Sequence, residues 1–338
     1  MTIRFAVIGL NHNHIYGQVK CLVDASAEFV SYYAPEADLI AEFAAHYPQV
    51  KLAHSAEEIL EDETIQIVAS AGIPSDRAPL GVRVMQHGKD YMVDKPGFTT
   101  LEQLAEVRRV QQETGRIYSV YFSERFSNAA TVKAGELVHA GAIGRVIQTL
   151  GIGPHRMFGH VQRPDWFFKR DRFGGILNDI GSHQVDQFFY FTGSTDAEIV
   201  SSQVGNMNHP TYPEVEDFGD MTLTSDRATG YIRVDWFTPD GLGTWGDGRL
   251  FLMGTDGYIE LRKYRDIGGR AGENHLFMVD NKGIQYIDCN DVPLTFGPLF
   301  LDDVINRTET AMTQEHCFRV SEIAMQAQAQ ARRLQSKH

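Results

Sequence analysis

The sequence contains few of the features that mark disulfide-rich, zinc-binding or membrane proteins. Only three cysteines occur among 338 residues, and Cys21, Cys289 and Cys317 lie far apart with no CxxC pair. Neither a disulfide framework nor a zinc knuckle is indicated. No apolar run approaches the length of a membrane span, and the N-terminal run is too short for a signal peptide. We therefore expect a soluble protein of the reducing cytoplasm.

Basic residues are also in the minority. Lysine and arginine number 31 against 44 aspartates and glutamates, which gives a formal net charge of -13. This balance argues against nucleic acid or an anionic membrane as the partner, and it favours a small molecule. A chain of this length is expected to hold about two domains of ordinary size.

The first 122 residues alternate short apolar runs with amphipathic ones. Because the runs are apolar without strict alternation, they read as strands buried on both faces; they are 3–8, 29–33, 65–70, 91–93 and 117–122. Ser55 with Glu58, and Thr100 with Gln103, have capping-box spacing ahead of helix-like runs. Strand and helix in alternation predict right-handed crossovers and a parallel sheet.

After Phe122 the pattern changes to one helix followed by many strands. The helix is expected from about Ser127 to Gly141. The predicted strands are 145–151, 199–204, 220–224, 231–237, 250–253 and 258–261. Hairpin signals in TDGYIE and DNKGIQ indicate a mostly antiparallel sheet. Helices near 299–307 and 314–333 are expected to cover part of it, and any uncovered apolar face is a candidate dimer interface.

The loop after the first strand lacks glycine where a dinucleotide-binding protein would carry G-x-G-x-x-G. The stretch GLNHNHIYG retains only Gly9, with Asn11 and His14 at the second and third positions. Asn11 tolerates a left-handed backbone and could preserve the turn. His14 could face phosphates at the helix N-terminus. Alternatively, His12 and His14 could bind a metal, but no further ligand has zinc-like spacing, or both could simply cap the loop.

The segment GGILNDIGSHQVDQFFYFTG is the most informative in the chain. Asp179, His183 and Asp186 fall at i, i+4 and i+7, on one face of a predicted helix. A carboxylate one turn before a histidine can orient the imidazole for proton transfer. Asp179 could instead favour the helix N-terminus, His183 could be structural, or the pair could hold a metal.

The segment VDKPG ends a predicted strand. Pro96 prevents a helix from starting at once, so Lys95 is placed at the carboxyl edge of the sheet, where open α/β folds bind ligands. Such a lysine can anchor a substrate hydroxyl or lower a neighbouring pKa. An exposed surface lysine is the alternative.

Together these residues carry a resemblance that spans nearly the whole chain. The altered glycine loop, Asp-Lys-Pro after the fifth strand, GG-x-x-x-D-x-G-x-H-x-x-D, the stretch YFSERF and a terminal EHCFRVSEIAMQAQ helix are similar to the glucose/fructose oxidoreductase and inositol dehydrogenase (Gfo/Idh/MocA) family. The motif order is far more specific than any single motif.

The resemblance implies an α/β protein. Residues 1–122 would form a Rossmann-type doubly wound parallel sheet that binds the cofactor. Residues 123–338 would form an α+β domain with a mostly antiparallel open sheet for substrate binding and oligomerisation, its last helix packing back on the first domain. A homodimer or tetramer through that sheet is expected.

The resemblance further implies an NAD(P)-dependent oxidoreductase acting on a sugar, polyol or related molecule. His183 would take the hydroxyl proton as hydride leaves the same carbon, Asp179 would assist it, and Lys95 would bind the reacting oxygen. Asp94 stands where the family has glutamate.

The family's cofactor contacts map onto Gly9, Asn11, His12, His14, Glu36, Pro74, Asp94 and Lys95, with no metal expected. The acid that often ends the second strand falls at Ala34, leaving Glu36 as its substitute, and no adjacent arginine welcomes a 2′-phosphate. The choice between NAD and NADP stays open.

Substrate contacts are expected in the segment before the GGILND motif. Sugar stacking by Trp166 and hydrogen bonds from arginine would suit a hydroxylated or acidic substrate, although core or interface packing is an equal alternative. The candidates are Arg125, His155, Arg163, Trp166, Arg172 and His183.

Two other function classes share these residues. A nicotinamide-dependent glycosidase or lyase would oxidise and re-reduce its substrate around an elimination. A cofactor-sensing regulator would keep the fold without turnover, although Lys95, Asp179 and His183 argue against it.

Overall fold

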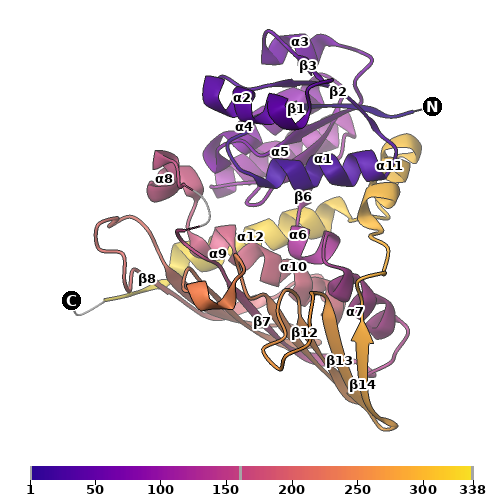
Figure 1. The fold of residues 1–338 in the computed structure, drawn as a ribbon, viewed down its shortest axis with the longest axis vertical. Helices are drawn as coiled ribbons and strands as arrows, with labels where there is room; N and C mark the ends of the chain where they lie inside the picture. The colour runs from indigo at the N-terminus through magenta and orange to yellow at the C-terminus, as the bar shows by residue number, and fades with distance from the viewer. Residues whose placement is uncertain (1, 160–161, 336–338) are drawn as a thin grey trace. The chain divides into compact units, whose positions relative to one another are not determined.

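A computed structural model describes residues 2–159 and 162–335, and divides the chain into two compact units (Figure 1). The first comprises residues 1–121 and 295–318, and the second comprises residues 122–294 and 319–338. The boundary near Phe318 falls inside α12 (Gln314–Gln330). Among the described residues, no helix combines the length and apolarity that crossing a bilayer requires.

The first unit is built on a six-stranded parallel sheet in the order β3-β2-β1-β4-β5-β6. Its strands are β1 (Arg4–Ile8), β2 (Glu28–Tyr33), β3 (Lys51–Leu52), β4 (Ile67–Ser70), β5 (Asp90–Asp94) and β6 (Tyr118–Tyr121). Five strands match the predicted apolar runs, and β4, β5 and β6 are buried throughout. The two-residue strand β3 was not predicted, because Lys51 and Leu52 are both exposed and carry no apolar pattern.

Among the described residues, six helices belong to this unit, and α3 and α5 begin at capping residues. They are α1 (His14–Asp24), α2 (Ala37–His46), α3 (Ala56–Glu61), α4 (Pro74–Gln86), α5 (Leu101–Thr114) and α11 (Phe296–Asn306). Ser55 and Thr100 accept hydrogen bonds from the third residue of their helices, as predicted. The strand order reverses between β1 and β4, which is the switch point where such sheets bind ligands.

The second unit contains a nine-stranded sheet in the order β14-β13-β12-β11-β7-β10-β9-β8-β15. Its strands are β7 (Val146–Pro154), β8 (Glu198–Gly205), β9 (Phe218–Thr224), β10 (Thr229–Asp235), β11 (Arg249–Gly254), β12 (Gly257–Arg262), β13 (His275–Asp280), β14 (Gly283–Asp288) and β15 (Arg332–Leu334). Among the described residues of this second sheet, only β7–β10 and β8–β15 pair in parallel. The mostly antiparallel prediction is confirmed, and both expected hairpins form.

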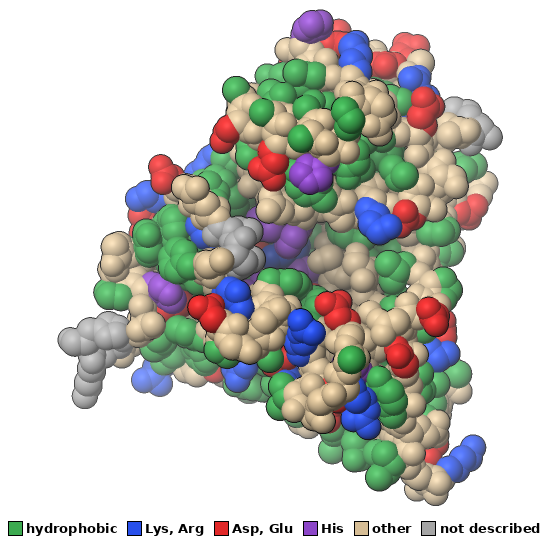
Figure 2. All heavy atoms as spheres, in the orientation of Figure 1, with side chains coloured by type: hydrophobic (Ala, Val, Ile, Leu, Met, Phe, Trp, Pro, Cys, Tyr) green, Lys and Arg blue, Asp and Glu red, His purple; other side chains and the backbone are tan. Residues whose placement is uncertain are grey.

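Helices cover one face of this sheet (Figure 1). They are α6 (Ser123–Phe126), α7 (Ala129–His139), α9 (Ile176–Asp179) and α10 (Gly181–Thr192), with η1 (Asp165–Phe168), α8 (Arg170–Phe173) and η2 (Asp240–Leu242) in the loops. Buried and less buried residues alternate along β9, which shows one covered face. On the face in Figure 2, acidic and basic side chains are interspersed.

Three predicted elements differ from the structure. The helix expected over 299–307 does not cover the second sheet; as α11 it lies in the first unit against α1, where a Cβ on Gly297 would come 2.7 Å from the Cys21 carbonyl oxygen. The last helix ends at Gln330, and Arg332–Leu334 pairs with β8 instead. The helix expected from Ser127 begins at Ala129, with Asn128 as its cap.

Candidate functional site

The loop after β1 requires glycine at its first position. Gly9 has a φ of +92°, and a Cβ there would come 3.0 Å from the Gly72 Cα. Two hydrogen bonds join this loop to the one after β4, from the His12 N–H to the Ala71 carbonyl and from the Ala71 N–H to the Gly9 carbonyl. The two loops therefore meet at the switch point, and a side chain at position 9 would separate them.

Asn11 acts through its side chain, and the expectation of a left-handed backbone there is wrong. Among described residues other than glycine, positive φ occurs at Ser26, Asn274 and Arg307. The Asn11 Nδ2 donates to Glu36 Oε1 at 2.8 Å. Glu36 follows β2 at the N-cap position of α2, and its buried Oε2 has no hydrogen-bond partner among the described residues. A hydroxyl donor would suit this oxygen, so the residues fit the ribose of a nicotinamide dinucleotide.

The two loop histidines share one carboxylate at the end of β5. His14, the first residue of α1, lies with its Nδ1 2.9 Å from Asp94 Oδ1. The His12 Nδ1 is 3.9 Å from Asp94 Oδ2 and accepts a hydrogen bond from the His14 N–H at 3.2 Å. This bond assigns the remaining proton of neutral His12 to Nε2.

Arg77, which sequence reasoning missed, holds this cluster in place. This α4 side chain is only 1% exposed. Its Nη2 donates to Asp94 Oδ2 at 2.9 Å, and its Nε donates to the Gly72 carbonyl at 2.7 Å. Its Nη1 reaches the carbonyls of Asp94, Lys95 and Pro96. One buried guanidinium thus binds the loop after β4 and the whole DKP segment.

The surroundings of Asp94 and His12 favour an ionised carboxylate and a neutral imidazole. Burial raises the pKa of Asp94, but His14 and Arg77 outweigh it and hold that pKa well below its ordinary value. Burial, followed by the neighbouring His14, lowers the pKa of His12 well below its ordinary value. The arrangement is therefore an ionised carboxylate beside a neutral His12.

The structure supplies the third metal ligand that spacing in the sequence did not show. Ligand atoms of His12, His14 and Asp94 all lie within 4.8 Å of one another. However, the Arg77 guanidinium contacts the same carboxylate, and both Asp94 oxygens already have partners. A cation would meet this fixed positive charge, so the geometry favours an anion-binding loop.

Lys95 and Pro74 flank the same loops. Lys95 follows β5 directly and is 3% exposed. Pro74 is buried and begins α4, where its missing N–H costs no helical hydrogen bond. Lys95 lies where the sequence predicted it, at the carboxyl edge of the first sheet, and Pro74 lies in the connection after β4 at the same edge.

In the second unit, the predicted catalytic pair spans two helices, the short α9 and the longer α10, instead of one. Asp179 ends α9 and His183 lies in the first turn of α10, with Ile180 between them. The His183 N–H donates to the Ile180 carbonyl, so the regular four-residue spacing is interrupted. Gly175 precedes α9 with a φ of +93°, and a Cβ there would meet the Gln328 side chain at 2.3 Å.

Arg163 lies in the electrostatic neighbourhood of Asp179. Burial lowers the pKa of Arg163 to about 10, and Asp179 opposes that shift. The guanidinium carbon lies 4.7 Å from the Phe167 ring centroid and 4.9 Å from that of Trp236. His155 contacts Trp236 in an edge arrangement at 5.5 Å. These contacts place Arg163 and His155 around one aromatic cluster.

The other predicted substrate residues have different surroundings. Trp166 is half-buried in η1 and contacts Phe167, and Arg172 is half-buried in α8. Arg125 forms two 2.7 Å hydrogen bonds with the buried Asp186 carboxylate. Its guanidinium also lies over the Phe126 and Tyr190 rings. The structure thus gives Arg125 and Asp186 a packing role in the second unit.

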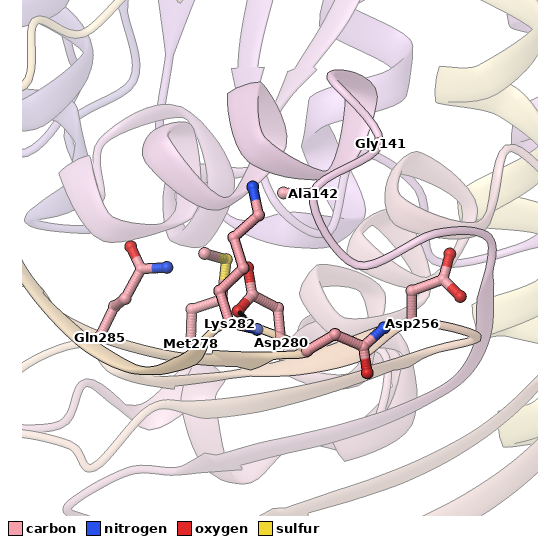
Figure 3. Close-up of a pocket in the computed structure, with 8 residues that line it drawn as sticks. Gly141, Ala142, Asp256, Met278, Asp280, Lys282 and Gln285 are labelled. Atoms are coloured by element: carbon pink, nitrogen blue, oxygen red, sulfur yellow. Dashed lines mark hydrogen bonds between the residues drawn. The ribbon is translucent and has the colours of Figure 1, made fainter.

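A separate hollow lies at the hairpin end of the second sheet (Figure 3). Asp256, Lys282 and Gln285 surround Met278 there. Asp280 accepts hydrogen bonds from the backbone of Lys282 and Gly283, so it caps the β13–β14 turn. This hollow contains no predicted site residue.

The fold and these loops define a class of protein with a nucleotide-binding Rossmann domain and a second α+β domain. Residues 3–122 match the oxidoreductase family with an NAD-binding Rossmann fold, and residues 131–260 match the GFO/IDH/MocA C-terminal domain. The chain belongs to the Gfo/Idh/MocA family of oxidoreductases.

Relatives and solved structures agree with this assignment. The NAD(+)-dependent scyllo-inositol 2-dehydrogenase of Bacillus subtilis is 29% identical over 84% of this chain and 79% of its own. The crystal structure of an oxidoreductase from Erwinia carotovora atroseptica SCRI1043 is 50% identical, with a TM-score of 0.96 over 99% of this chain and 100% of that one. Levoglucosan dehydrogenase in complex with NADH and levoglucosan shares the fold at 16% identity, with a TM-score of 0.81 over 98% and 97%.

Other alignments are shorter. The NADP(+)-dependent scyllo-inositol 2-dehydrogenase IolW of Bacillus subtilis aligns over 52% of this chain and 48% of its own length. The D-xylose dehydrogenase of Paenarthrobacter nicotinovorans aligns over 43% of this chain and 38% of its own. The chain thus matches about half or less of these two enzymes.

Proposed function

We propose that this oxidoreductase transfers hydride between a nicotinamide cofactor and a hydroxyl-bearing carbon of a sugar or polyol. The observation that carries the proposal is the buried His183 at the start of α10, with Asp179 four residues before it and Arg163 coupled to Asp179. Relatives named for inositol, xylose and levoglucosan support the substrate class.

We assign the proton chemistry to the chain's own side chains. In the second unit, His183 takes the proton of the substrate hydroxyl, and Asp179 orients the substrate and assists that transfer. In the first unit, Lys95 binds the oxygen that loses this proton. The bound nicotinamide supplies the hydride chemistry. In the direction of reduction the same groups return the proton.

We propose that the loops of the first unit hold the dinucleotide. Gly9 permits close approach of the backbone, while His12, His14, Pro74 and Asp94 line the switch point. Glu36 follows β2 with an unsatisfied buried oxygen, which suits a ribose hydroxyl. A carboxylate there opposes a 2′-phosphate, so NAD is favoured over NADP.

We place the substrate against the second unit's aromatic cluster. Arg163 and His155 supply polar groups beside Trp236, and Trp166 and Arg172 lie on the neighbouring short helices. Guanidinium and imidazole groups beside aromatic rings suit a hydroxylated ligand. Arg125 acts indirectly, because its guanidinium already binds Asp186.

We also propose a cytoplasmic homo-oligomer. Cys21, Cys289 and Cys317 form no disulfide in the part of the chain that the structure describes, as a reducing compartment favours. Large apolar side chains remain exposed on the strands of the second sheet, and an oligomer would cover them; they include Val200, Tyr231, Met253, Tyr258, Ile284 and Tyr286.

Replacing the proposed base tests this function. His183→Ala should abolish polyol-dependent reduction of the nicotinamide, while NADH and NADPH titrations followed by fluorescence stay close to wild type. His139→Ala, which removes an exposed histidine of the same unit, should retain turnover. Turnover at the wild-type rate by His183→Ala would overturn the assignment.

A further inference from the structure

The second unit contains a buried ion pair, Glu124 with Lys263, that is separate from the residues assigned to the proposed reaction. Glu124 of α6 is 2% exposed, and Lys263, which follows β12, is fully buried. The Lys263 Nζ donates to Glu124 Oε2 at 2.9 Å, to the Glu124 carbonyl at 3.2 Å and to Gln187 Oε1 at 2.7 Å. All three ammonium donors therefore have acceptors.

Two glutamines connect this pair to the helix that carries His183. The Gln184 Nε2 donates to Glu124 Oε2 at 2.7 Å. The Gln187 Nε2 donates to the His183 carbonyl at 2.9 Å. A Cβ at Gly151 of β7 would lie 2.4 Å from Gln184 Oε1, so glycine there leaves room for this bridge. The pair and the start of α10 are therefore held as one unit.

The charge of Glu124 acts on the same histidine. Its Oε1 is buried and has no hydrogen-bond partner among the described residues. Burial raises the pKa of Glu124, but Lys263, then His183 and His155, hold it well below its ordinary value. An ionised carboxylate is thus maintained within electrostatic reach of both histidines.

Two other carboxylates near His183 in the sequence are each coupled to a cation. Asp179 lies four residues before it and is coupled to Arg163. Asp186, one turn later on α10, is paired with Arg125. Tyr264 also couples to Glu124, and burial raises the pKa of this phenol well above its ordinary value. Glu124 differs from Asp179 and Asp186 because His183 is among the groups that hold its pKa low, and because one of its oxygens has no hydrogen-bond partner among the described residues.

We infer that Glu124, kept ionised by Lys263, is a positioning residue that stabilises the imidazolium of His183 while it holds the substrate proton. This inference rests on the proposed function. The proton leaves the hydroxyl oxygen and resides on His183, while Glu124 stays ionised throughout. Lys263 makes the buried carboxylate tolerable, because an unpaired one would be protonated instead.

The test is direct titration of His183 in the folded full-length chain, which needs no turnover. The signals of the thirteen histidines are followed by NMR against pH, and His183→Gln identifies the one of interest. Glu124→Gln should lower the His183 pKa by at least about half a unit, because it removes the carboxylate and leaves Lys263 charged. The double variant Glu124→Gln with Lys263→Met removes both charges, so it should lower the His183 pKa by less than the single variant does.

The double variant also guards against failure to fold, since neutral replacement of a buried ion pair is often tolerated. Asp90→Asn, which breaks the ion pair between the buried Asp90 and the exposed Arg307 in the first unit, should leave the His183 pKa unchanged. An unchanged or raised His183 pKa in both Glu124 variants would overturn the inference.

Turnover then separates this inference from the proposed function. In an active enzyme, Glu124→Gln should lower kcat more than it changes KM, with the pH profile displaced in the direction of the His183 titration. Unchanged titration in an active protein overturns the inference alone. Shifted titration in a protein that never turns over nicotinamide overturns the reaction and leaves the coupling in place.

Discussion

Asp94 in the first unit and Glu124 in the second are buried carboxylates with matching surroundings. Asp94 is 1% exposed and Glu124 is 2% exposed. Each is bound by one buried cation, Arg77 or Lys263, and each is coupled to two histidines. The same set of charges therefore occurs once in each unit, although the two sequences around them share no pattern.

The two clusters differ in their access to solvent. Both oxygens of Asp94 have partners, while its histidines, His12 and His14, keep 23% and 30% of their side chains exposed. Glu124 has one oxygen with no hydrogen-bond partner among the described residues, and His183, to which it is coupled, is buried. The first cluster exposes polar groups to solvent, as the proposed binding loop requires, while in the second a buried carboxylate is coupled to a buried histidine.

Removing Arg77 is expected to have the largest effect. Arg77→Met leaves Asp94 buried without its cation and releases the carbonyls of the DKP segment, so the free energy of unfolding should fall by about 3–5 kcal/mol. Urea denaturation measures this change. Arg83 lies on the same helix as Arg77 and forms an exposed ion pair with Glu57. Arg83→Met should therefore lower the free energy of unfolding by no more than about 1 kcal/mol. Equal losses would refute a special role for Arg77.

Sequence reasoning named residues in the loops, such as His14 and Asp94, but it did not name the buried cations that fix their positions. Strand ends and helix starts placed His14 and Asp94 separately, since both follow from local pattern. Their contact joins positions 80 residues apart. Arg77 was missed because an arginine inside an amphipathic helix is normally exposed, and nothing local shows that its side chain turns inward. Lys263, which directly follows β12, was missed because a lysine at the end of a strand is also normally exposed.

The fold was easier to predict where local chemistry decides it. Ser55 and Thr100 marked helix starts because a cap acts over three residues. The interruption at Ile180 and the short strand after Gln330 depend on packing against distant strands, so periodicity alone predicted longer helices. Asn11 shows the same limit, because its partner Glu36 comes from another loop.

Adding one methyl group at Gly151 tests whether the second cluster depends on close packing. Gly151→Ala would press on Gln184 and break its bond to Glu124, so we expect a loss of about 1–3 kcal/mol. Gly17→Ala is the matched control, because its Cβ would meet nothing within 4 Å and alanine favours a helix by up to about 1 kcal/mol. Thermal melts of both variants decide the matter; a stable Gly151→Ala protein would show that Gln184 does not need this space.

The smallest expected effect is a pH dependence of the free energy of unfolding that comes from His12 in the Asp94 cluster. The pKa of His12 is lowered in the folded chain, so below about pH 6.5 the unfolded chain binds a proton that the folded chain does not. The free energy of unfolding should therefore fall as pH drops through this range, by up to about 1.4 kcal/mol per pH unit.

His12→Asn keeps an acceptor for the His14 N–H and removes the titrating ring, so its urea midpoint should depend less on pH between 7 and 5. His54→Asn, at an exposed position before α3, should retain the wild-type slope. If His12→Asn and wild type give equal slopes, His12 is not held neutral by this cluster, and the contrast between the two carboxylates would rest on geometry alone.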